Sequence, residues 1–291
     1  MNWQGVIPAI TTPFREDLSI DHDFVARHAS WMASEGCTGI VALGSLGEGA
    51  TLELDEKVAI LKTCVQALKV PVAAAISSLS TDGAVRLAKA AQQAGCSGLM
   101  VLPPYVYSTD WREMKAHIVA ILRATDLSCM LYNNPIAYGT DFLPEQIAEL
   151  AGEHENLHAV KESSGDVRRV TAIRSLLGKR LAILVGLDDA IVEGIAAGAT
   201  GWIAGLCNAL PRESVALFEG ALRGDDVSDL YAWFLPLLRL DTLKKFVQAI
   251  KLVQQEVGMG SERVRPPRLP FTGDERDAAL RLIRTALGAK P

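Results

Sequence analysis

The sequence is poor in cysteine and has no arrangement of cysteines that would build a disulfide framework or a zinc site. Five cysteines occur in 291 residues, they are widely spaced, and no Cys-x-x-Cys pair is present. This pattern is typical of reduced thiols in the core of a cytoplasmic protein. The five are Cys37, Cys64, Cys96, Cys129 and Cys207.

Blocks of basic residues and long apolar runs are also missing. The net charge is −5 and no arginine-rich arm occurs, so nucleic acid is not an expected partner. No apolar run is long enough to cross a bilayer, and the N-terminus lacks the basic and apolar stretches of a signal peptide. What the chain does have is 49% hydrophobic and 22% charged residues, a composition that favours a globular protein with a large core.

Signatures of metals and dinucleotides are absent as well. The glycines of "GSLGEG" fall at positions 44, 47 and 49, which is not the spacing of a dinucleotide-binding loop. Four of the five histidines fall in predicted helices or loops. The fifth, His158, lies in a predicted strand and points away from Lys161 by strand alternation. We therefore expect neither a metal nor a cofactor.

One pattern repeats eight times along the chain. A short apolar run is followed by a turn and then by a longer amphipathic stretch, which predicts parallel strands covered by helices. The predicted strands span residues 5–11, 39–44, 71–77, 98–104, 128–134, 157–163, 181–187 and 201–206. The predicted helices span residues 20–35, 53–68, 81–94, 110–124, 143–152, 166–177, 188–197 and 211–222.

Eight such units within residues 1–223 predict an α/β fold, the (β/α)8 TIM barrel. An open, doubly wound sheet is the alternative, but it rarely needs eight regular units. Residues 224–291 break the alternation and are predicted to be helical, with an interruption at Pro236. We interpret them as a C-terminal helical extension packed on the barrel, since no linker composition separates them.

Polar side chains gather at the predicted strand ends, where a barrel of this kind carries its chemistry. Lys161 ends the apolar run of the sixth strand and is the only lysine at any of the eight strand ends. Tyr132 ends the fifth strand at a comparable depth, and Ser45 lies in the glycine-rich turn after the second. A lysine inside an apolar barrel is desolvated, which favours the free amine. Such an amine attacks the carbonyl of a 2-oxo acid to form a Schiff base.

The remaining groups suit this reaction. A tyrosine chained to a hydroxyl can carry the protons, and the glycine-rich turn offers N–H groups to a carboxylate. Each residue also has a plain structural interpretation. Lys161 could extend its amine to solvent, and Tyr132 could be a core tyrosine. The turn could be no more than a tight turn, and Asp188 with Asp189 could cap a helix.

The sequence as a whole resembles the dihydrodipicolinate synthase and N-acetylneuraminate lyase family. "GSLGE", "YNNP" and "VKESSGD" carry the resemblance, in this order and at these strand ends, and it extends over nearly the whole chain. The resemblance implies a Schiff-base enzyme without a cofactor, in the form of a homotetramer. It further implies that Lys161 is the Schiff-base lysine, that Tyr132 relays protons, and that Ser45 links the relay.

Three positions depart from the pattern of dihydrodipicolinate synthases. Leu46 replaces a second hydroxyl residue in the glycine-rich turn. Val106 stands where those synthases have a tyrosine that enters the relay of the neighbouring subunit, and Tyr105 or Tyr107 could replace it. Ala137 stands where an arginine would hold the carboxylate of the second substrate. These departures argue against the lysine-biosynthetic activity.

The activity that we expect is a lyase acting on a small 2-oxo acid or its cyclic imine, best matched by a Δ1-pyrroline-4-hydroxy-2-carboxylate deaminase. The alternatives are 4-hydroxy-tetrahydrodipicolinate synthase and a dehydratase or aldolase of 2-keto-3-deoxy sugar acids. A small-molecule sensor on the same fold and a metal-dependent aldolase are weaker alternatives. Besides the three catalytic candidates, the residues expected to bind substrate are Leu46, Gly47, Gly186, Asp188, Ile203 and Tyr105.

Overall fold

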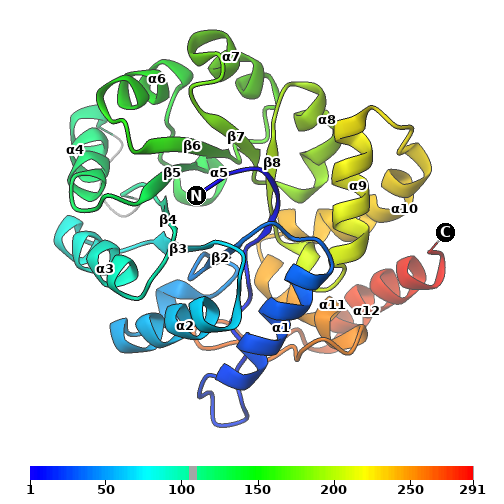
Figure 1. Ribbon diagram of the computed structural model, residues 1–291. Coiled ribbons are helices and arrows are strands. Elements are labelled where there is room, and N and C mark those ends of the chain that lie inside the picture. The colour runs from blue at the N-terminus through cyan, green and yellow to red at the C-terminus, as the bar shows by residue number, and fades with distance from the viewer. Residues whose placement is uncertain (105–109, 291) are drawn as a thin grey trace.

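Eight parallel strands form a barrel with helices around its outside (Figure 1). The computed structural model describes residues 1–104 and 110–290. The strands are hydrogen-bonded in the order β1-β8-β7-β6-β5-β4-β3-β2. A parallel bridge between Ala9 and Val41 brings the two edge strands together and closes the ring. The predicted (β/α)8 barrel is therefore confirmed.

The strands are shorter than the apolar runs that predicted them, because each run continues into the loop at its carboxyl end. They are β1 (Gly5–Pro8), β2 (Ile40–Ala42), β3 (Val72–Ile76), β4 (Gly98–Val101), β5 (Ser128–Asn133), β6 (Leu157–Glu162), β7 (Ala182–Val185) and β8 (Gly201–Ala204). Nearly every strand residue is buried, as expected for strands with helices on one face and the barrel core on the other.

The helices of the barrel follow the predicted alternation. They are α1 (His22–Ser34), α2 (Leu54–Ala67), α3 (Thr81–Gln93), α4 (Trp111–Leu122), α6 (Pro144–Glu153), α7 (Arg168–Leu177), α8 (Ile191–Ala196) and α9 (Pro211–Arg223). The segment predicted as one helix over 188–197 begins instead with a 3-10 turn, η2 (Asp188–Ala190). One short helix was not predicted at all, α5 (Pro135–Tyr138), which directly follows β5.

Three more helices follow the barrel: α10 (Ser228–Leu238), α11 (Phe246–Glu256) and α12 (Gly273–Gly288). The predicted interruption at Pro236 is wrong, because α10 continues through this residue to Leu238. A proline near the end of a helix removes only one hydrogen bond. Burial of Phe234, Leu237 and Leu238 on the same helix outweighs that loss. The helical segment ends later, after the 3-10 turn η4 (Arg239–Thr242).

The C-terminal helices lie against the barrel, beside α1 and α9 in Figure 1. A buried ion pair joins the two parts: Lys251 Nζ of α11 lies 2.5 Å from a carboxylate oxygen of Glu48, in the turn after β2. The other oxygen of Glu48 accepts the backbone N–H of Arg265 at 3.0 Å. The C-terminal helices and the barrel are therefore packed together through buried contacts. The boundary at residue 223 marks only the end of the strand–helix alternation.

The cysteines are thiols in the core, as predicted. All five cysteines are buried and unbridged. Within residues 1–104 and 110–290, no helix is both long enough and apolar enough to span a membrane.

Removing the buried cation tests the ion pair. We expect Lys251→Met to lower the free energy of unfolding by about 3 kcal/mol or more, because Glu48 would keep a buried charge without its main partner. The double variant Glu48→Gln with Lys251→Met should recover part of this loss. Urea unfolding measures both. Lys245→Met, which breaks an exposed pair with Glu275, serves as the control and should change stability little. If Lys251→Met and Lys245→Met lowered the free energy of unfolding equally, the buried pair would contribute no more to stability than the exposed one.

Candidate active site

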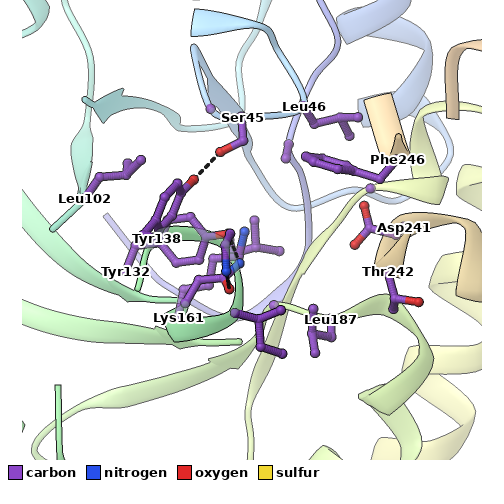
Figure 2. A pocket seen from close by; sticks show the side chains of 18 of the residues that line it. Ser45, Leu46, Leu102, Tyr132, Tyr138, Lys161, Leu187, Asp241, Thr242 and Phe246 are labelled. Atoms are coloured by element: carbon purple, nitrogen blue, oxygen red, sulfur yellow. Dashed lines mark hydrogen bonds between the residues drawn. The ribbon is translucent and has the colours of Figure 1, made fainter. Parts of the chain in front are cut away.

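A cavity of about 490 Å³ opens at the carboxyl ends of the strands. Six of the residues predicted from the sequence line it: Ser45, Leu46, Tyr132, Lys161, Gly186 and Ile203. The C-terminal segment supplies part of the opposite wall, with Asp241, Thr242 and Phe246 facing the tyrosines and Lys161 across the cavity (Figure 2). The site is therefore assembled from both the barrel and the helices that follow it.

Lys161 lies on β6 directly beside Tyr132 on β5, since the two residues are partners in the strand register. The lysine residue is 6% exposed, and its Nζ lies 4.0 Å from the centre of the Tyr132 ring. Gly186 on the other side leaves room for it, because a Cβ at that position would come within 2.5 Å of Lys161 Cε. The Tyr132 ring contacts the lysine on one side, and the absence of a side chain at Gly186 leaves space for it on the other.

Burial sets the protonation of this lysine. It lowers the pKa of the Lys161 amine below the ordinary value of 10.5, while the charges of Asp241, Tyr138 and Asp188 oppose the shift. The same burial raises the pKa of Asp241 well above its ordinary value. The two groups therefore affect each other's protonation: a charged Asp241 favours the charged amine, and a neutral amine favours the protonated acid.

Three hydroxyl groups meet above the lysine. Ser45 Oγ hydrogen-bonds to Tyr138 Oη, from the turn after β2 to α5 (Figure 2). The ring of Tyr138 packs edge-on against that of Tyr132, with 5.7 Å between centroids. Asn134 Nδ2 donates to Tyr132 Oη at 3.0 Å. Burial raises the pKa of Tyr132 to about 12, so this phenol keeps its proton at neutral pH.

The glycine-rich turn is held in place by contacts of Gly47 and Glu48 with the rest of the protein. Gly47 does not line the cavity, and its carbonyl oxygen accepts the Thr12 hydroxyl at 2.6 Å. Glu48 adopts a left-handed conformation (φ 55°) and turns its side chain into the core, toward Lys251. Leu46 and Ser45 remain at the cavity wall. The contact of Gly47 with substrate stays a prediction, and the contact that the structure shows for this residue is structural.

Asp188 also differs from the prediction. It does not line the cavity and is completely buried, where its carboxylate accepts the backbone N–H groups of Gly205 and Leu206 and the Trp202 indole N–H. Burial raises its pKa to about 6 against these donors. The carboxylate ties the end of β8 to the turn after β7. The predicted contact of Asp188 with substrate is not supported by this placement, because the carboxylate is directed at backbone and indole N–H groups.

Several residues of the site were not assigned from the sequence. Tyr138 has no predicted role, and Asp241 lies in the segment 224–291, for which the sequence predicts helices and no site residue. Arg268 and Lys244 also line the cavity, so it is not without cations. No local pattern marks these positions, because they meet the strand ends only in the folded chain. Tyr105 lies outside the described residues.

The comparisons with known proteins agree with this geometry. The family model of the dihydrodipicolinate synthetase family matches residues 2–286. The chain belongs to this family. Its relatives include proteins named 4-hydroxy-tetrahydrodipicolinate synthase, from Methanothrix thermoacetophila (32% identical, covering 98% of this chain and 97% of that one) and Agrobacterium fabrum (33% identical, 96% and 98%).

A solved structure shares the fold as well. It is the 4-hydroxy-tetrahydrodipicolinate synthase of Methylacidiphilum fumariolicum, with a TM-score of 0.93 and 26% identity, covering 99% of this chain and 95% of that one. Members of the dihydrodipicolinate synthetase family are lyases of the class I aldolase type that use a lysine Schiff base, and this chain is such an enzyme. Across residues 1–104 and 110–290 no group of three or more His, Cys, Asp or Glu side chains is placed to hold a metal ion.

The coupling between Lys161 and Asp241 predicts a pH effect. Because the carboxylate raises the pKa of the amine, Asp241→Asn should lower that pKa further. Schiff-base formation requires the free amine, so the acid limb of its pH profile should move to lower pH. The measurement is the rate of borohydride trapping with pyruvate from pH 5 to 9. Asp226→Asn, an exposed carboxylate, is the control. A limb that stays in place or moves to higher pH would contradict the coupling.

Proposed function

We propose that Lys161 is the lysine that forms the Schiff base and that Tyr132 moves the protons of the reaction. The observation that carries this is their pairing in the β5–β6 register, which places a desolvated amine under a phenol at the mouth of the barrel. Backbone N–H groups of the turn at Ser45 and Leu46 are the candidates for holding the substrate carboxylate.

Covalent trapping tests this assignment. Incubation with pyruvate and borohydride should add one reduced pyruvate to a peptide containing Lys161. Lys161→Ala should give no adduct and lose about 10³-fold or more of the activity, because the nucleophile is gone. Its circular dichroism and thermal unfolding should stay close to those of the wild type. An adduct on another lysine, or a variant that keeps more than about a percent of turnover, would refute the assignment.

For the substrate, we infer Δ1-pyrroline-4-hydroxy-2-carboxylate. Ala137 offers no cation for a second carboxylate, and Leu46, Leu102 and Leu187 make much of the wall apolar. A compact ring with one carboxylate suits such a pocket. Asp241 supplies what a hydroxylated substrate requires, a carboxyl group of raised pKa that faces the lysine across the cavity. A protonated carboxyl group can assist the departure of a hydroxyl group as water.

The reaction follows from these groups. The Lys161 amine adds to C2 of the ring imine, and cleavage of the bond from C2 to the ring nitrogen leaves a lysine iminium and a free amine on C5. Tyr132 takes a proton from C3 while its own phenol proton passes on to solvent in the cavity, which gives an enamine. The enamine expels the C4 hydroxyl as water with a proton from Asp241. Proton shifts then convert C5 into an imine. Hydrolysis of both imines releases ammonia, 2-oxoglutarate semialdehyde and the free lysine, with net consumption of one water.

A second candidate is 4-hydroxy-tetrahydrodipicolinate synthase, in which the pyruvate enamine condenses with an aldehyde. Two observations favour it. The relatives described above carry this name. In addition, Arg268 and Lys244 line the cavity and could replace the missing arginine as partners for a second carboxylate.

A pair of assays on one preparation separates the two candidates. We expect ammonia release from the hydroxypyrroline carboxylate, with little condensation of pyruvate with aspartate semialdehyde. Lys161→Ala serves as the blank for both, since each reaction needs the Schiff base. Asp241→Asn should reduce ammonia release by about 10²-fold, the usual contribution of a general acid. Efficient condensation without pyrroline turnover would refute the deaminase proposal in favour of the synthase.

A further inference from the structure

A chain of three hydroxyl groups lies within a single copy of this protein. Ser45 comes from the turn after β2, while Tyr132 and Tyr138 come from β5 and α5. Ser45 Oγ contacts Tyr138 Oη directly, and Tyr138 in turn packs edge-on against Tyr132 (Figure 2). The two phenols are close enough that each affects the pKa of the other. Each of the three groups can both donate and accept a proton.

The short helix α5 explains how Tyr138 reaches this place. Pro135 opens the helix, and Gly139 ends it with φ 69°, which glycine adopts without strain. The Asn134 side chain links Tyr132 to this helix: it accepts the Ala137 N–H at 2.9 Å to cap α5, and it donates to Tyr132 Oη at 3.0 Å. Asn134 therefore helps to hold the helix that carries Tyr138 beside Tyr132.

We infer that Tyr138 is a proton-relay residue that passes protons between Ser45 and Tyr132, so that the relay of the Schiff-base reaction is complete within one subunit. When Tyr132 gives its proton to the carbanion at C3, it takes one from Tyr138, which takes one from Ser45. Ser45 lines the cavity and is only partly buried, so it takes its proton back from solvent. No phenolate builds up in this sequence. This fits two phenols whose pKa values are both raised by burial.

The relay also bears on Val106. Dihydrodipicolinate synthases, which this sequence resembles, place a tyrosine of a neighbouring subunit at that point of the relay, and this chain cannot do so from Val106. Tyr138 contacts the same serine from within the chain. The inference rests on the lysine Schiff base of the family and not on the pyrroline substrate, so it stands or falls separately from the proposed deamination.

Exchange of the pyruvate methyl protons in D2O, followed by proton NMR, tests the relay without a second substrate. Tyr138→Phe should lower the exchange rate by about 10²-fold, while borohydride trapping at saturating pyruvate stays at the wild-type level. A residue that only maintained the pocket would affect trapping and exchange together. Tyr231→Phe, which removes a phenol bonded to Glu193 and the Asp189 carbonyl, is the matched control and should leave the exchange unchanged.

Three results would overturn the inference. The first is wild-type exchange in Tyr138→Phe, the second is loss of trapping together with exchange, and the third is loss of exchange in Tyr107→Phe with Tyr138→Phe unaffected. A wild type that forms no adduct would instead refute the assignment of Lys161 itself. Mixed refolding of Lys161→Ala with Tyr138→Phe chains tests the single-subunit part. We expect no recovery of exchange, and recovery would show that the two residues act across subunits.

Discussion

The buried ion pair between Glu48 and Lys251 is the interaction on which the site depends most. It is formed by a turn after β2 and a helix near the C-terminus, and both side chains are almost fully excluded from solvent. A carboxylate left unpaired at that depth would be strongly destabilising. The turn that carries Ser45 and the segment that carries Asp241 are thus held in place by the same contact. The two walls of the cavity can form only when the barrel and the C-terminal helices fold together.

Exclusion of water has a consistent effect on the groups around the substrate. It lowers the pKa of the Lys161 amine and raises those of Tyr132, Tyr138 and Asp241. Every one of these shifts favours the neutral form. Burial in the cavity therefore favours the free amine of Lys161 and the protonated forms of the two phenols and the acid, which is the combination that imine chemistry needs. The apolar walls supply this environment as much as the polar groups do.

The rigid strands and the loops around them contribute different residues to the site. The amine and its neighbouring phenol lie on adjacent strands, whose register fixes their separation. Other groups near this pair lie in a short helix after β5 and in the C-terminal segment: Ala137 and Tyr138 in α5, and Asp241 in η4. A family can keep one Schiff-base core and change its substrate in this way, because loops tolerate substitution that strands do not.

The barrel and the pairing of Tyr132 with Lys161 follow from the sequence alone. Alternating apolar runs and amphipathic stretches leave few other folds, and equal depth at two successive strand ends places Tyr132 beside Lys161. Only the tertiary structure decided what surrounds them. Ser45 meets Tyr138 across 93 positions and Glu48 meets Lys251 across 203. No local pattern encodes such pairs. Asp188 and Asp241 show the same limit: both are acidic residues near strand ends or helix breaks, and only packing turned one toward backbone N–H groups and the other toward the cavity.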